Sequence, residues 1–197
     1  MAFFRLFYFF LLSLPLHAEV PSQLVFRSEP QNGYFLETED DTYGKVTVKD
    51  DSEIYIVFAD LNDNDQAYAY LNHDKNDITM KVLDENHFSL GNVIRTNSHL
   101  TGINYLIYDP QGSLQAKGKL NFVGTRIIIR DPNNHWTKFA TFHRPNFKIP
   151  TRKDYWYLTI HKNERIDPRV LIMIGTLQAE IEKNNSPIRR WSLCLEE

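Results

Sequence analysis

One segment near the end of the chain, residues 170–177, constrains the fold more than any other because it is apolar on every side. It reads Val-Leu-Ile-Met-Ile-Gly-Thr-Leu, so a helix formed by it has no polar face to turn toward water. Asp167 suits the N-cap of such a helix, Pro168 its first position, and a polar stretch from Lys183 its end. We therefore predict a buried helix over about 167–183, with an eight-residue strand as the alternative that its Val and Ile residues allow.

The chain ahead of this helix supplies strands that could enclose it. Segments rich in β-branched and aromatic residues are separated by clusters of Asn, Asp and Gly, which is typical of successive antiparallel strands. The helix is too short for a bilayer, which needs about 20 apolar residues. A sheet that curls around it buries every side and leaves no open edge. The predicted fold class is mainly β, an antiparallel meander closing into a barrel around one C-terminal hydrophobic α-helix. Leu171, Ile174 and Leu177 should then be buried.

A weak repeat supports the succession of hairpins. Three segments each read as a strand ending at an Asp, then a turn, then another strand, and the three residues are Asp84, Asp109 and Asp131. An Asp side chain can bond the backbone of its own turn, and the Pro that follows Asp109 and Asp131 presets the next φ angle. The pattern predicts hairpins, whether as a true repeat or as the ordinary turn chemistry of an antiparallel sheet.

These features together resemble the tubby C-terminal-like superfamily, which includes the LURP-one-related proteins and the phospholipid scramblases. The resemblance covers roughly 33–184, and its best matches are 105–112 and the helix entry at 166–169, preceded by the strand-like segment 155–160. It implies a closed antiparallel barrel of about a dozen strands around a hydrophobic C-terminal helix. The chain departs from the family in its N-terminal leader and in its polar tail, 185–197. The cytosolic, lipid-regulated roles of the family therefore do not transfer directly.

The first 18 residues differ from the rest of the chain. One base, Arg5, lies in a run dense in Phe, Leu and Tyr, which ends at Ala18 just before the first acid, Glu19. This is the pattern of a secretory signal peptide, with an uncleaved anchor or a buried first strand as alternatives. It predicts export, either to the periplasm of a bacterium or into the medium.

The expected organisation follows from these segments. We predict a signal peptide over 1–18, a lead-in over 19–33, a barrel domain over 34–184 and a C-terminal tail over 185–197. The lone cysteine of the chain, Cys194, lies in this tail, where an oxidising compartment would leave it free or in an intermolecular bridge. No integral membrane span is expected in the mature chain.

Motifs of catalysis and of cofactor binding are missing from the sequence. It contains no Gly-x-Ser-x-Gly, Walker, His-Glu-x-x-His or Cys-x-x-Cys motif, and His135, His143 and His161 lack ligand spacing. Residues 60–65 begin like a Ca²⁺ loop, but the sixth position is not Gly and the twelfth is Leu71 instead of Glu. A solvated hairpin loop is the preferred interpretation, with calcium binding as the alternative. We predict no cofactor and no metal site.

Charge is distributed unevenly along the chain. Its formal net charge is only −3, which gives no case for a nucleic-acid partner. Residues 37–85 nevertheless hold fourteen acids and four bases, while 117–169 hold twelve bases and four acids. The two halves could neutralise one another or form ordinary solvated faces, or the basic half could bind an anionic partner.

The basic half points to one candidate site. Residues 144–153 contain two Pro, which predicts an irregular loop, and aromatic residues lie beside its bases. Cations next to aromatic rings suit an anionic head group at a membrane interface. The predicted ligand-binding residues are Arg144, Lys148, Arg152, Lys153 and Trp156. The sequence thus favours an exported, non-catalytic binding module for anionic lipid or a protein surface. The alternatives are a structural protein of the cell envelope and an enzyme whose site is assembled from distant residues.

Overall fold

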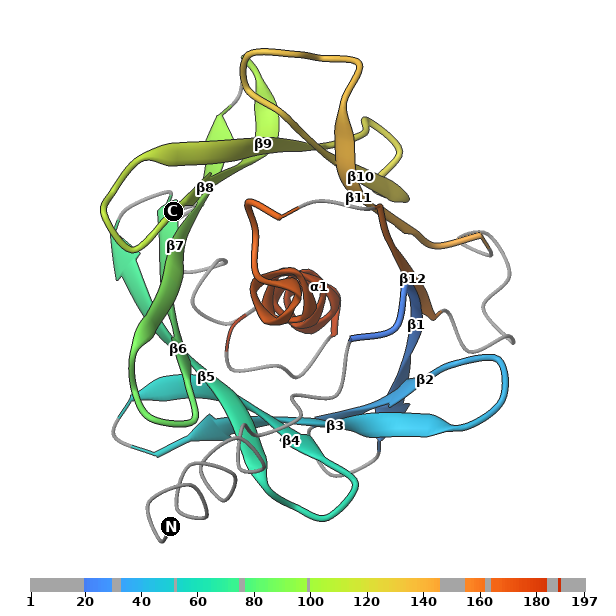
Figure 1. Ribbon diagram of the computed structural model, residues 1–197. Helices are drawn as coiled ribbons and strands as arrows, with labels where there is room; N and C mark the ends of the chain where they lie inside the picture. Colours follow the sequence, from blue (N-terminus) through green and yellow to red (C-terminus); the bar gives the residue numbers. More distant parts are fainter. Residues whose placement is uncertain are drawn as a thin grey trace, which may run out of the picture.

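The computed structural model describes residues 20–29, 33–51, 53–74, 77–98, 100–145, 155–161, 164–183 and 188. This part of the chain forms twelve strands and one α-helix (Figure 1). The strands are β1 Gln23–Glu29, β2 Gly33–Glu37, β3 Thr42–Asp50, β4 Ile54–Asp60, β5 Asp65–Asp74, β6 Asp77–Asp84, β7 Ser89–Ser98, β8 Gly102–Tyr108, β9 Leu114–Leu120, β10 Arg126–Arg130, β11 Lys138–His143 and β12 Trp156–Ile160. The helix, α1, is Pro168–Glu182.

The strands form a closed antiparallel barrel. Each strand pairs with the next along the chain, and β1 also pairs with β12, with Gln23 opposite Thr159. Figure 1 looks along the barrel and shows α1 running through its middle. Leu171, Ile174 and Leu177 are each 0% exposed. The predicted fold class and the predicted burial of the helix are therefore confirmed.

The helix begins and ends where the sequence predicts, to within one residue. Asp167 adopts an extended conformation as N-cap, and its Oδ1 accepts a hydrogen bond of 2.8 Å from the backbone N–H of Arg169. Pro168 occupies the first turn, where the missing N–H costs nothing. Inside the helix, the Thr176 hydroxyl donates to the carbonyl of Ile172, so this buried polar group is satisfied.

The hairpin turns follow the Asp pattern seen in the sequence. In three of them the Oδ1 of the leading Asp accepts the backbone N–H groups two and four residues later. The leading residues are Asp60, Asp84 and Asp109, and Asp131 accepts from the N–H of Asn133. The segment 60–65 is thus a hairpin turn of the same type. Among the described residues, no group of three or more His, Cys, Asp and Glu side chains is arranged to hold a metal ion.

The barrel has two different ends, which we call the helix-entry end and the helix-exit end. At the helix-entry end, where α1 begins, Arg169 donates to the Glu85 carboxylate (3.0 Å), the Asp167 carboxylate (3.0 Å) and the carbonyl of Gln66 (3.1 Å). The turns between β4 and β5, β6 and β7, β8 and β9, and β10 and β11 lie at this end. At the helix-exit end, where α1 ends, lie the C-terminal ends of β1, β3, β5, β7, β9 and β11.

Three predicted segments, the leader, the lead-in and the tail, differ in how far the described residues include them. The leader over 1–18 and Cys194 lie outside the described residues. The strand that closes the barrel, β1, comes from the stretch 19–33 that was expected as a lead-in. Ile188, which belongs to the predicted tail, is buried in the core cluster.

Gly175 sets how closely the helix approaches the strands. A Cβ atom at this position would lie 2.5 Å from Cζ of Phe26 and 3.0 Å from Cε1 of Phe142. Gly175→Ala gains about 1 kcal/mol in helix propensity but overpacks the core, which costs about 1–3 kcal/mol. We expect a net loss in the free energy of unfolding, measured by urea denaturation. Adding Phe26→Leu should make the double variant less destabilised than the sum of the single changes. Additive losses, or a stabilised Gly175→Ala protein, would contradict this packing.

Candidate functional site

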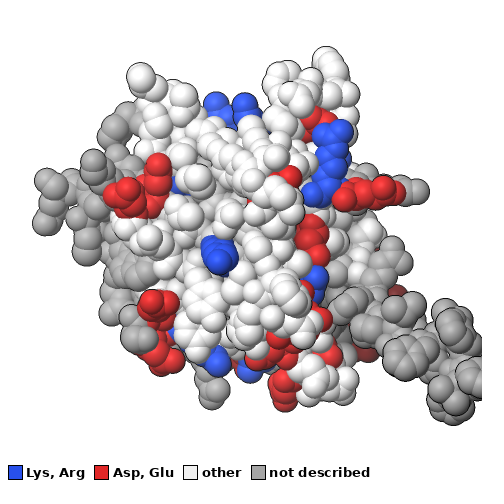
Figure 2. Space-filling model, turned by 60° about the vertical axis from the view of Figure 1, so that its left-hand side comes forward, with Lys and Arg blue, Asp and Glu red and all other residues white. Residues whose placement is uncertain are grey.

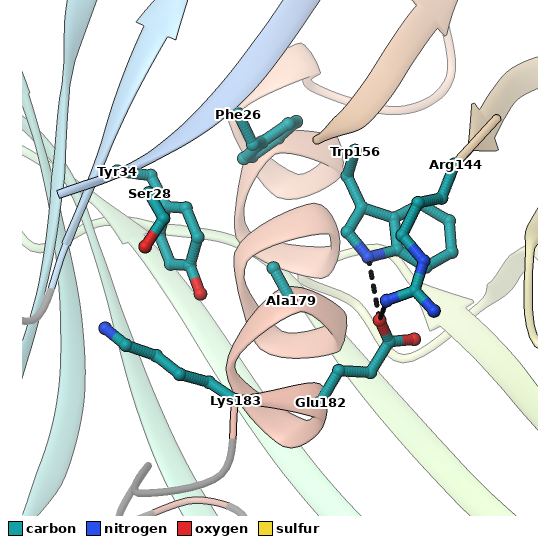
Figure 3. Close-up of a pocket in the computed structure, with 8 residues that line it drawn as sticks. All are labelled: Phe26, Ser28, Tyr34, Arg144, Trp156, Ala179, Glu182 and Lys183. Atoms are coloured by element: carbon teal, nitrogen blue, oxygen red, sulfur yellow. Dashed lines mark hydrogen bonds and ion pairs between the residues drawn. The ribbon is translucent and has the colours of Figure 1, made fainter. Parts of the chain in front are cut away.

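The structure separates the predicted site residues into two groups. Arg144 and Trp156 lie together at the helix-exit end, beside the last turn of α1 (Figure 3). Lys148, Arg152 and Lys153 lie outside the described residues.

Arg144 and Trp156 both bind a carboxylate of the helix. Oε2 of Glu182 accepts from Arg144 and from the indole N–H of Trp156, the latter at 3.2 Å. The guanidinium carbon of Arg144 also lies 5.8 Å from the centre of the Trp156 ring. The other oxygen of Glu182 accepts from the amide of Gln178 at 2.7 Å, and Gln178 in turn accepts from the hydroxyl of Tyr105. We call Arg144, Trp156, Gln178 and Glu182 the helix latch.

Burial controls the electrostatics of this latch. It raises the pKa of Glu182 above its usual range, although the hydrogen bond from Gln178 and the positive charge of Arg144 act in the opposite direction. Burial also raises the pKa of the neighbouring Tyr34, with the Glu180 carboxylate as the second cause. Arg144, Trp156 and Gln178 therefore favour the ionised form of Glu182, while burial disfavours it.

A small cavity of about 180 Å³ lies next to the helix latch. Its wall includes Ser28, Tyr34 and Lys183, and the aromatic ring of Phe26 lies above them in Figure 3. The Lys183 ammonium lies 3.6 Å from the Glu180 carboxylate and 5.8 Å from the centre of the Tyr34 ring. The charged residues that line this cavity are paired with acids or bases of the same region: Arg144 with Glu182, and Lys183 with Glu180. These pairs hold the end of α1 in the barrel.

A larger groove, of about 620 Å³, lies on the outside of the barrel over β8, β9 and β10. Four of the residues that line it are basic: Lys117 and Lys119 from β9, and Arg126 and Arg130 from β10. Their inward neighbours Ala116, Ile127 and Ile129 are buried, so the strand alternation turns the four bases outward. We call this the basic groove.

The bases of this groove repel one another. Lys117 lies directly opposite Arg130 on the adjacent strand, and like charges in such a position destabilise a sheet. Asp131, the acid that lines the groove, is bound at 2.6 Å by Arg165 and has a pKa below its usual range, chiefly because it accepts the N–H of Asn133. Among the described residues, none forms an ion pair with Lys117, Lys119 or Arg126.

The positive potential reaches the next strand. His143 of β11 lies opposite Arg126, and its pKa falls below the usual value, first because it is partly buried and then because of the Arg126 charge. Charge is not spread evenly over the barrel. On the side that Figure 2 turns toward the viewer, where β6 and β7 run, most charged groups lie toward the margins, and one basic group stands in an otherwise uncharged middle.

Sequence reasoning counted these bases in the charge of 117–169 but did not select them as a site. A signal was present: Lys117 and Lys119 are two residues apart, which places both on one face of a strand. Their proximity to Arg126 and Arg130 depends on the pairing of β9 with β10. The sequence pattern therefore did not identify these four bases as one site, because the register of β9 against β10 brings them together.

Comparisons with known proteins bear on the fold. No protein-family model matches the chain, and no curated protein matches it either. The chain is similar to the X-ray structure of a protein from Arabidopsis thaliana, with a TM-score of 0.55 and 8% sequence identity. The match covers 83% of this chain and 94% of the other. At this identity the likeness shows a shared barrel fold. In the described residues, no helix has the length and hydropathy to cross a membrane.

The helix latch generates a pH-dependent prediction. Because the pKa of Glu182 is raised in the folded protein, the stability linked to this group is greatest at low pH and decreases as the pH rises through its folded pKa. The positive charge of Arg144 lowers the pKa of Glu182, so Arg144→Gln raises this pKa further. The variant therefore loses more of its free energy of unfolding than the unchanged protein does as the pH rises. We expect a loss of about 1–3 kcal/mol at neutral pH and a smaller loss near pH 4, measured by urea denaturation.

Arg27→Gln is a suitable control for this experiment. Arg27 pairs with Glu37 at 2.7 Å, but the two side chains are 44% and 27% exposed. Such a pair contributes at most about 1 kcal/mol. Equal losses for Arg144→Gln at both pH values would show that its charge does not act through Glu182.

Proposed function

We propose that the protein is a non-catalytic binding module that attaches to an anionic lipid surface through the basic groove. The observation that carries this proposal is the like-charged pairing of Lys117 with Arg130 inside a groove that also holds Lys119 and Arg126. Such an arrangement destabilises the free protein. A negatively charged partner relieves the repulsion, so binding is favoured by the same charges that weaken the sheet.

The predicted basic loop begins next to this groove. The backbone N–H of Arg144 donates to the carbonyl of Thr125 at 2.9 Å, so the chain leaves β11 beside the turn between β9 and β10. Lys148, Arg152 and Lys153 follow in sequence. We propose that these three bases supply additional positive charge to the same partner. Arg144 and Trp156 instead bind Glu182 and position the helix.

The strength of such binding follows from the number of bases. Each Lys or Arg close to an anionic membrane contributes about 1 kcal/mol, and the effect disappears as salt is added. The superfamily that the sequence resembles includes the phospholipid scramblases, which supports a lipid-directed role, and the barrel fold agrees with that resemblance. Export is part of the proposal and depends on the leader sequence alone.

Vesicle sedimentation tests this function. We expect the protein to bind phosphatidylcholine vesicles that contain phosphatidylglycerol, to ignore pure phosphatidylcholine, and to dissociate as salt is raised. Lys117→Gln with Lys119→Gln should weaken binding roughly tenfold or more, because two groove charges are lost. The melting temperature should not fall, because removing Lys117 also removes its repulsion with Arg130.

Lys49→Gln with Lys81→Gln is the matched control. It removes the same net charge from exposed positions on β3 and β6, outside the groove. The control should bind nearly as the natural sequence does. Equal weakening by both double variants would indicate a general effect of net charge, and failure of the unchanged protein to bind at low salt would refute the function.

A further inference from the structure

Two neighbouring turns at the helix-exit end expose apolar side chains. Leu100 lies between β7 and β8, and Phe122 and Val123 lie between β9 and β10. Leu100 and Phe122 are 97% and about 106% as exposed as in an extended chain, and Val123 is 52% exposed. Asn104 pairs with Lys119 across β8 and β9, so the two turns leave adjacent strands at the same level.

The exposed ring of Phe122 belongs to the basic groove. It lines the groove together with Lys117, Lys119 and Arg126, so an apolar tip stands at the margin of a positively charged surface. Long basic side chains can keep their charge at a lipid head group while their methylene stems follow an apolar surface downward. This combination suits a bilayer interface better than a flat protein surface.

Four of the six backbone N–H groups in residues 121–126, the turn between β9 and β10, have hydrogen-bond partners within the turn. Oδ1 of Asn121 accepts the N–H groups of Thr125 and Arg126 at 2.8 and 2.9 Å. The carbonyl of Asn121 accepts the N–H of Gly124 at 2.9 Å, and its N–H donates to the carbonyl of Arg126. Gly124 has a φ of 73°, which allows this tight conformation. These four groups keep their partners if the tip leaves water, so the N–H groups of Phe122 and Val123 are the ones in this turn that still need the polar head groups as acceptors.

The helix-entry end provides an internal contrast. It also exposes large apolar residues, Leu61, Phe88 and Trp136, at 59%, 71% and 90%. Trp136 lies in the turn between β10 and β11, which begins at Asp131. However, Leu61 lies between Asp60 and Asp63, and Phe88 follows Glu85 by three residues. Acids beside these side chains repel an anionic surface. The turns that carry Leu100, Phe122 and Val123 contain no acid in residues 98–102 or 120–126.

We propose that Leu100, Phe122 and Val123 enter the boundary between head groups and acyl chains of an anionic bilayer while the basic groove contacts lipid phosphates. This inference rests on the proposed function and adds to it the depth and orientation of binding. The helix-exit end faces the membrane, and the acid-rich turns of the helix-entry end point away from it. The transfer of these three apolar side chains from water into the bilayer contributes to the affinity for the membrane. This contribution does not depend on the salt concentration.

The test compares two matched double variants on phosphatidylcholine–phosphatidylglycerol vesicles. Leu100→Asn with Phe122→Asn should weaken binding by about tenfold or more at every salt concentration, because apolar burial is lost. The slope of log affinity against log salt should stay unchanged, because all the bases remain. Leu61→Asn with Phe88→Asn removes the same side-chain types from the helix-entry end and should bind as the unchanged protein does.

A second measurement reports insertion directly. Val123→Cys, made together with Cys194→Ser, allows an environment-sensitive dye to be attached at the tip. We expect its emission to shift to the blue on vesicle binding and to be quenched by lipids that carry a shallow quencher. The same dye at Phe88→Cys should not respond.

The outcomes separate this inference from the proposed function. If the unchanged protein binds anionic vesicles but the tip variant binds equally well and the dye at position 123 stays in water, insertion is wrong and electrostatic attachment stands. If the unchanged protein does not bind these vesicles at low salt, both are wrong.

Discussion

The burial of a helix that is apolar on every side is the constraint on which this structure depends. A single packed face would leave the other sides of α1 in water, so the strands must surround it. A ring of twelve strands does this, and the pairing of β1 with β12 removes the open sheet edges at the same time. The close fit at Gly175, against Phe26 and Phe142, shows how little free space remains between the helix and its enclosure.

Polar contacts hold the helix where the apolar enclosure ends. Arg169 binds Glu85 and Asp167 at the helix-entry end, and Arg144 binds Glu182 at the helix-exit end. These charges are partly shielded from water, so each needs its partner more than an exposed pair would. The residues nearest the barrel mouth thus fix the helix along its axis, and they are poorly suited to release their partners for a ligand.

Because α1 fills the interior of the barrel, a large ligand-binding surface can lie only on the outside. The cavity beside the helix latch is small, whereas the basic groove lies over β8–β10 on the outside of the barrel. The groove keeps Lys117 opposite Arg130 at a cost in stability, and the exposed turn of Phe122 adjoins it. Repelling charges destabilise the free protein, and apolar side chains as exposed as Leu100 and Phe122 contribute no burial to its stability. An anionic bilayer would neutralise the charges and bury the apolar side chains.

The sequence by itself determined the helix from Asp167 to Lys183, its burial and the Asp-led hairpins, because caps, apolar patterns and turn bonds depend on residues close together in the chain. It also predicted the closed barrel, since an all-apolar helix admits few other surroundings. Only the tertiary structure decided the role of Arg144, whose partner Glu182 lies 38 residues away. Only strand register placed Lys117 beside Arg130, and Phe122 near Leu100. Contacts between distant segments follow from which strands pair and in what alignment, and no local pattern in the chain specifies that alignment.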